Sequence, residues 1–181
     1  MIPLDIVAFH EAGHAVAALV LRIRVDKVSG VASKGRRKNE ETSGHCNIAA
    51  PWPRQGQGVG APIDYAKCTP EQCRDVAIYH LAGGEAERML REKRYPDQLR
   101  VSAEGHEDVI VAHRAAVEWR RQLEGTIPPG NSGDDVLQFR CKAREMILEH
   151  WSAVEAVANA LIGKTITGAE ARNLFEAATS S

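Results

Sequence analysis

The segment FHEAGHAVA, residues 9 to 17, places two histidines and a glutamate inside a run of apolar residues. Apolar side chains recur around it at the spacing of an α-helix, from a proline at position 3 to about position 22. Alanines at five positions along this run keep the helix slim. The pattern predicts an apolar helix that carries a small group of polar residues.

Gly13 lies in the middle of this predicted helix. A glycine at such a position costs about 1 kcal/mol relative to alanine, so the fold must need the space that it leaves. The simplest explanation is a second helix that packs tightly against the first.

The two histidines have the spacing of a metal site. Residues four apart lie one above the other on a helix, so His10 and His14 can turn their imidazoles toward one point, which can hold zinc. Glu11 lies about 100° around the helix from His10, where it can reach a water molecule activated by the metal. In the HExxH arrangement this glutamate acts as the general base. The alternative is that these residues share the spacing by accident.

A catalytic zinc site normally has three protein ligands, so one more must come from elsewhere. The candidates cluster in SAEGHEDVIVAH, residues 102 to 113. We favour Asp108, which is acidic and precedes an apolar stripe that would press its helix into the core. His106, Glu107 and Glu104 are the alternatives, and each also suits a helix N-terminus without any metal.

The rest of the chain reads as mostly helical. Two short strands are predicted at 23–32 and 44–50, joined by a charged loop and followed by an irregular segment at 51–62. Helical patterns cover 70–93, about 103–123 and 134–162. Thr69 with Gln72, and Thr167 with Glu170, predict capping boxes at two helix starts. We therefore predict a mainly α (α+β) helical bundle with a small two- or three-stranded sheet.

Length and charge limit the possible functions. The 181 residues suit a single domain that spans the chain, and 23 basic residues against 24 acidic ones give no overall attraction to nucleic acid or an anionic membrane. The basic cluster KGRRK at 34–38 is followed by acidic residues, which favours a solvated loop over a binding patch.

The four cysteines and the absence of a signal peptide predict reduced thiols and a cytoplasmic protein. Cys68 and Cys73 are too far apart in sequence for a typical structural zinc knuckle. Polar residues interrupt the apolar N-terminal run well before the roughly 20 residues that a membrane span needs. We expect no membrane segment.

Several motifs in this order resemble the peptidase domain of the membrane-anchored, ATP-dependent zinc proteases of the FtsH type. VAFHEAGHAV is similar to their zinc-binding helix, and VDKVSGVA to the strand that follows it. HLAGGEAE resembles their helix with a Gly-Gly pair, and SAEGHEDVIVAHRAAVEW the segment that delivers an aspartate ligand. The stretch from AREMILEHW to ARNLFE resembles their C-terminal helices. The likeness spans almost the whole chain.

This resemblance implies a role for each matching residue. His10, His14 and Asp108 would bind zinc, and Glu11 would be the catalytic base. Gly83 and Gly84 would be the close-approach partners of Gly13. Glu87 matches the glutamate after the glycine pair, where it either orients a zinc ligand or is an ordinary solvated helix residue.

The chain also departs from the family. It has no GxxxxGK[ST] nucleotide-binding motif, so we expect it to act without ATP, either alone or supplied by a separate ATPase. Residues 33–43 form an insertion, 51–62 replace an acidic helical stretch, and Glu85 stands where the family tends to have arginine. Substrate choice and the formation of a homo-oligomeric ring are therefore left open.

Together these observations predict a zinc metallopeptidase that cuts peptides or unfolded polypeptide. The second strand, with His45, Cys46 and Asn47, would offer its edge to an extended substrate. Trp52 would either line the same cleft or serve as a packing anchor. The rival interpretations are a catalytically silent zinc-binding interaction module and a metal hydrolase that acts on a non-peptide amide.

Overall fold

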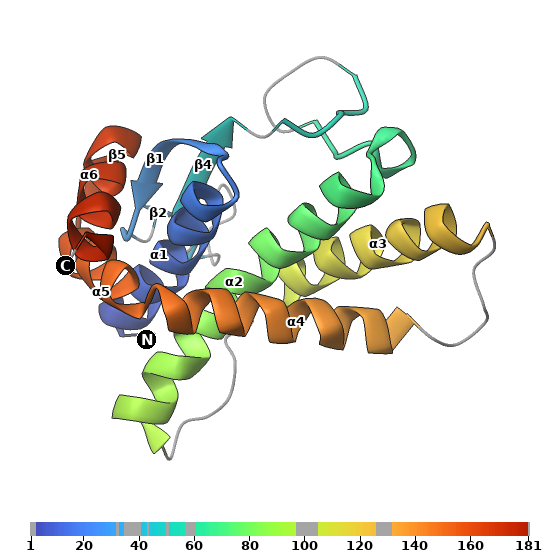
Figure 1. Ribbon diagram of the computed structural model, residues 1–181. Helices are drawn as coiled ribbons and strands as arrows, with labels where there is room; N and C mark the ends of the chain where they lie inside the picture. The colour runs from blue at the N-terminus through green and yellow to red at the C-terminus, as the bar shows by residue number, and fades with distance from the viewer. Residues whose placement is uncertain are drawn as a thin grey trace.

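Helix α1 (Leu4–Val20) lies at the centre of the fold and packs against both helices and a sheet (Figure 1). The computed structural model describes residues 3–31, 33–34, 41–42, 44–49, 51–56, 61–96, 105–125 and 132–180. Every residue of α1 from Ile6 to Ala18 is buried, including both histidines and the glutamate. Burial on all sides explains why the segment is apolar around its whole circumference.

The sheet packs on one side of α1. Strands β4 (His45–Ala49), β1 (Arg24–Ser29) and β5 (Thr165–Thr167) form an antiparallel sheet in that order, so β4 lies at an edge. The first two strands were predicted, whereas β5 was not placed by the sequence. The segment predicted as a charged loop contains a two-residue pairing of β2 (Ser33–Lys34) with β3 (Glu41–Thr42), so that prediction is wrong at these positions.

Helix α2 (Pro70–Arg94) begins at the predicted capping box, which is confirmed. Thr69 Oγ1 accepts from the backbone nitrogen of Gln72 at 3.2 Å, and the Gln72 side chain accepts from the backbone nitrogen of Thr69 at 2.9 Å. A short 3-10 helix, η1 (Tyr65–Lys67), precedes it. In the described parts of 51–62 there is no helix or strand, and Arg54 pairs with Ile63 in an isolated bridge.

At Gly13, helix α1 packs closely against α2, as the energetic cost of a glycine within a helix predicted. A Cβ atom at Gly13 would lie 2.6 Å from the carbonyl oxygen of Ala82 and 3.0 Å from Cα of Gly83. The expected role of Gly84 is wrong, because a Cβ there would have no neighbour within 4 Å. Gly83 also leaves room for His14, because a Cβ atom added at Gly83 would lie 2.3 Å from Nε2 of the His14 imidazole.

Four further helices complete the described chain: α3 (Gly105–Glu124), α4 (Ser132–Glu149), α5 (Trp151–Leu161) and α6 (Gly168–Thr179). The capping box of Thr167 and Glu170 at the start of α6 is confirmed. The helical pattern at 134–162 is divided at His150, although neither glycine nor proline stands there. The division lets α4 pack on α2 and α3 while α5 packs on α1 and α6.

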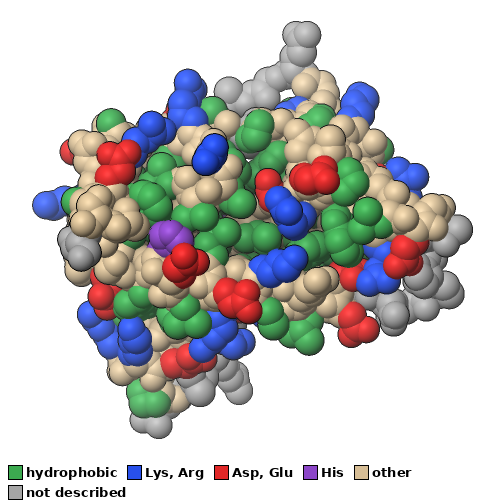
Figure 2. Space-filling view, viewed as in Figure 1, with side chains coloured by type: hydrophobic (Ala, Val, Ile, Leu, Met, Phe, Trp, Pro, Cys, Tyr) green, Lys and Arg blue, Asp and Glu red, His purple; other side chains and the backbone are tan. Residues whose placement is uncertain are grey.

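Helix α4 buries a narrower stripe than its apolar pattern suggested. Phe139 and Ile147 are fully buried, whereas Leu137 is 58% exposed. Figure 2 shows hydrophobic side chains among basic and acidic ones on the face that α4 crosses. The mainly helical architecture with a small three-stranded sheet is nevertheless as predicted.

Two findings concern the cysteines and the apolar character of the helices. All four cysteines lie in the described residues and are free thiols. Of the helices that the structure describes, none has both the length and the apolar character needed to cross a bilayer.

Candidate metal centre

Three side chains from two helices converge on one point. His10 and His14 come from α1, and Asp108 comes from the first turn of α3. The Nε2 atoms of the two imidazoles are 3.1 Å apart, and Asp108 Oδ2 lies 3.4 Å from His10 Nε2 and 3.3 Å from His14 Nε2. Among the described residues this is the one group of His, Cys, Asp and Glu side chains arranged to hold a metal ion.

Each imidazole is oriented by a contact on its far side. His14 Nδ1 is 2.9 Å from the carbonyl oxygen of Tyr79, which can only accept a hydrogen bond, so Nδ1 carries the proton. His10 Nδ1 is 3.2 Å from Oε2 of Glu87, a carboxylate that also accepts from Arg91 at 2.8 Å. When both rings are neutral, this arrangement leaves the lone pair of each Nε2 atom facing the centre.

The centre thus brings together three hydrogen-bond acceptors that need a positive charge between them. Around a tetrahedral zinc ion with bonds of about 2.0 Å, neighbouring ligand atoms are roughly 3.3 Å apart. The separations here are 3.1, 3.3 and 3.4 Å. Two imidazoles and one carboxylate, in this spacing, suit zinc with a further position left for a non-protein ligand.

The pKa values of the same side chains reflect this concentration of acceptors. Burial alone would lower the pKa of His10, but hydrogen bonds to Asp108 and Glu87 and the charge of Glu11 raise it to about 10. Burial alone would raise the pKa of Asp108, but the imidazoles of His14, His10 and His80 hold it well below its usual range. The acceptors around His10 therefore favour its protonated form when no metal ion is bound.

Glu11 lies beside this centre at the wall of a cleft. It is only 5% exposed, and it lines a space of about 360 Å³ together with the three candidate ligands. Gly44 packs against it, because a Cβ at Gly44 would lie 2.7 Å from Cγ of Glu11. The cleft therefore holds a carboxylate next to, but outside, the group of candidate ligands.

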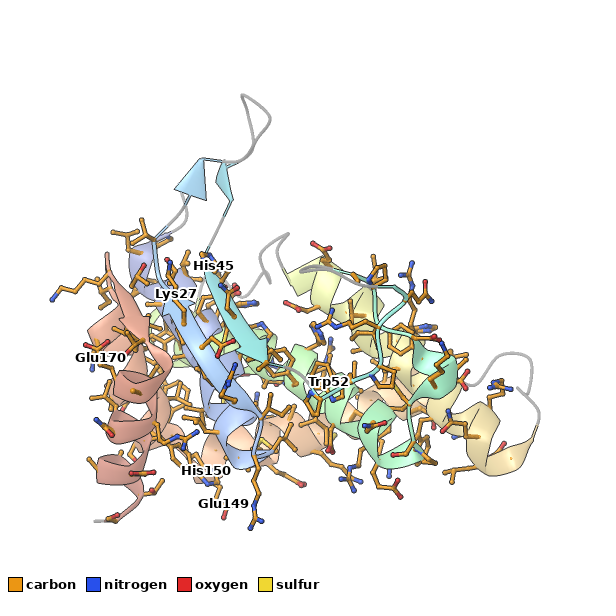
Figure 3. The ribbon with its side chains drawn as sticks, turned by 90° about the horizontal axis from the view of Figure 1, so that it is seen from above. Lys27, His45, Trp52, Glu149, His150 and Glu170 are labelled. Carbon is orange, nitrogen blue, oxygen red and sulfur yellow. The ribbon has the colours of Figure 1, made fainter. Side chains whose placement is uncertain are left out.

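Strand β4 forms another wall of the cleft. His45 and Cys46 line it, whereas Asn47, on the same strand, does not. Figure 3 shows His45 at the start of β4. Burial, together with the charge of Glu11, raises the pKa of the Cys46 thiol well above its usual range, so the thiol stays neutral. The hydroxyl of Tyr79 donates to the carbonyl oxygen of Cys46 at 3.4 Å and ties the strand to α2.

Trp52 is a packing residue rather than a wall of the cleft. Its side chain is 5% exposed, and its ring centroid lies 5.6 Å from that of Tyr79 and 6.3 Å from that of His80. Figure 3 shows it beyond β4, on the side of α2. Of the two interpretations of Trp52 from the sequence, the geometry favours the packing anchor.

The other third-ligand candidates have different positions. Glu107 is exposed and lines the cleft without joining the ligand group. Glu104 and the side chain of His106 lie outside the described residues.

His80 is the site residue that the sequence did not single out. Its Nδ1 atom is 2.7 Å from Asp108 Oδ1. The contact joins α2 to α3 across 28 positions of the chain, and no spacing within either helix indicates it. The available signal was a histidine three residues before Gly83, in a helix already expected to pack against the ligand helix.

Glu85, the departure from the family pattern, has a structural role. It is buried, and its carboxylate lies 3.5 Å from Arg140 Nε and 3.4 Å from Arg144 Nη1, both on α4. The residue therefore ties α2 to α4, two helices that pack on each other. Its charge is thus balanced within the fold.

A comparison with protein-family models finds no match for this chain, and a search of curated proteins finds none either. The resemblance to FtsH-type peptidase domains therefore stays a prediction from the sequence motifs. The distances between the candidate ligand atoms do not depend on this resemblance.

For a zinc ion held by these three side chains, the binding affinity should rise with pH. Because the pKa of His10 is raised to about 10 in the metal-free protein, its proton must leave before the imidazole can bind a metal ion. We expect the affinity to increase about tenfold per pH unit between about pH 6 and pH 8. Competition with a chromophoric chelator, corrected for the chelator's own protonation, measures this, and an affinity that stays level would contradict it.

Proposed function

We propose that this protein is a zinc-dependent metallopeptidase that hydrolyses peptide bonds in peptides or unfolded polypeptide. The observation that carries the proposal is the convergence of His10 Nε2, His14 Nε2 and Asp108 Oδ2 within 3.4 Å of one another, beside Glu11. A structural zinc site usually has four protein ligands, whereas three ligands next to a cleft are typical of a catalytic one.

His10, His14 and Asp108 would hold the ion. When bound, zinc lowers the pKa of a water molecule and polarises the carbonyl group of an amide. Glu11 is the general base in this proposal: it accepts a proton from the attacking water and passes it to the leaving nitrogen. Its position in the cleft wall, outside the ligand group, supports this role because its carboxylate is not used to bind the ion.

The substrate would bind as an extended chain along β4. This strand is the edge of the sheet, and its residues His45 and Cys46 line the cleft that holds Glu11. Pairing with a strand edge uses backbone hydrogen bonds, which give affinity with little sequence preference. Alternating backbone contacts to residues 44–49 in a peptide-inhibitor complex would support this part of the proposal, and a substrate bound elsewhere would end it.

The resemblance to FtsH-type peptidase domains supports the same activity and adds further proposals. Peptide cleavage would proceed without ATP, because the chain lacks a nucleotide-binding motif of the GxxxxGK[ST] form. The four free thiols favour a cytoplasmic location for this activity. A separate ATPase that delivers substrate and a ring of identical subunits are both compatible with the resemblance, and neither is required for the chemistry of the centre.

Metal removal tests the proposal directly. We expect the purified protein to contain about one zinc ion per chain and to cleave casein or an unstructured peptide. Dialysis against a chelator should abolish cleavage, and one equivalent of zinc should restore it. Bound zinc without cleavage of any peptide would favour the silent interaction module, and cleavage of small amides alone would favour the non-peptide hydrolase.

A further inference from the structure

The two oxygens of the Asp108 carboxylate face different partners. Oδ2 points to the two imidazoles of α1, at 3.4 and 3.3 Å from their Nε2 atoms. Oδ1 lies 2.7 Å from Nδ1 of His80 on α2. A carboxylate can only accept at this contact, so His80 Nδ1 carries the proton and donates.

We propose that His80 is a positioning residue that reserves one oxygen of Asp108 for the metal ion. The inference rests on the proposed function, because it assumes that the centre binds zinc. A carboxylate with both oxygens free can turn about its terminal bond and bind a metal through one oxygen or both. The hydrogen bond from His80 occupies Oδ1 and leaves Oδ2 as the single ligand atom.

The surroundings of His80 hold its ring in place for this role. The centroid of the His80 ring lies 5.0 Å from that of Tyr79 and 6.3 Å from that of Trp52. The side chain of His80 is 20% exposed. Asp108 also borders a cavity of about 30 Å³ that is lined by His80, Gly84 and Arg140. The carboxylate is therefore not enclosed by packing on every side, and the hydrogen bond from His80 is a specific constraint on its orientation.

His80 completes a pattern in which α2 supports every candidate ligand. Glu87 contacts His10 Nδ1, the carbonyl oxygen of Tyr79 contacts His14 Nδ1, and His80 contacts Asp108 Oδ1. Partners of this kind typically change metal affinity by 10- to 100-fold when they are removed. His80 is the member of this set that supports the ligand contributed by α3.

Two variants separate the hydrogen bond from the bulk of the ring. His80→Asn keeps an N–H donor close to the position of Nδ1, whereas His80→Phe keeps an aromatic ring and removes the donor. We expect zinc affinity, measured by chelator competition, to fall about 10- to 100-fold in His80→Phe and to stay within a few-fold of wild type in His80→Asn.

The visible spectrum of the protein with Co²⁺ in place of zinc is a second measurement, and a simple loss of packing would not change it. The visible spectrum of Co²⁺ is intense for four-coordinate sites and weaker for five-coordinate ones. We expect His80→Asn to keep the wild-type spectrum and His80→Phe to weaken it, because Asp108 is then free to bind through both oxygens. An unchanged affinity and spectrum in His80→Phe would overturn the inference, as would an asparagine variant that behaves like the phenylalanine one.

The outcome for wild type distinguishes this inference from the proposed function. If the wild-type protein binds no zinc, the proposed function fails and the inference fails with it. If wild type binds zinc and cleaves peptides while His80→Phe keeps both the zinc affinity and the cobalt spectrum of wild type, the inference alone fails.

Discussion

Replacement of Glu11 by glutamine is expected to lower the rate of peptide cleavage by about 10²- to 10⁴-fold while zinc stays bound. Glutamine has nearly the same shape, so it fits the buried site beside Gly44 without a carboxylate to accept the proton. The three candidate ligands are unchanged, and the metal content should therefore remain at the wild-type level. Parallel measurement of cleavage and of bound zinc checks both parts.

The control for this variant is Glu145→Gln, which removes an exposed carboxylate from α4. We expect it to cleave at the wild-type rate. Glu11→Gln that retains zinc and full activity would remove Glu11 from the mechanism. Zero activity in both wild type and Glu11→Gln, each with full zinc, would instead favour the silent interaction module.

The second large effect is expected from the ligands themselves. His14→Ala and Asp108→Ala should each weaken zinc binding by more than about 100-fold, the upper range for loss of a partner that only orients a ligand. Each change removes one of the three acceptor atoms that lie within 3.4 Å of one another. Metal analysis after purification and chelator competition measure the loss, and cleavage should disappear with the ion.

Glu107→Ala is the matched control for Asp108→Ala. The two acidic residues are adjacent on α3 and both line the cleft, yet Glu107 is outside the ligand group. We expect Glu107→Ala to retain zinc. Zinc loss in Glu107→Ala, with retention in Asp108→Ala, would contradict the assignment of the third ligand.

The sequence predicted the parts of this structure that depend on local geometry. The spacing of His10 and His14 on one helix, the two capping boxes and the close approach at Gly13 each follow from rules that act within a few residues. Asp108 was favoured among several neighbours by its place before an apolar stripe. The structure now brings it to the two histidines.

The features that the sequence did not predict depend on contacts between distant segments. The partnership of His80 with Asp108 joins two helices, and β5 is a three-residue strand that forms by pairing with β1. The apolar pattern of 134–162 continues through His150, yet the helix divides there and α4 and α5 pack on different neighbours. Periodicity within one element carries no information on such choices.

Helix α2 contributes none of the three candidate ligands, yet it contacts each of them on the side that faces away from the centre. The contacts come from Tyr79, His80 and Glu87. A small slide of this helix along its axis would disturb the three supports at once. Substitutions far along α2, with no contact to the ion, should therefore alter which metals the protein prefers. If the centre binds a metal ion as proposed, its geometry depends on the position of α2 as well as on the identity of the three ligands.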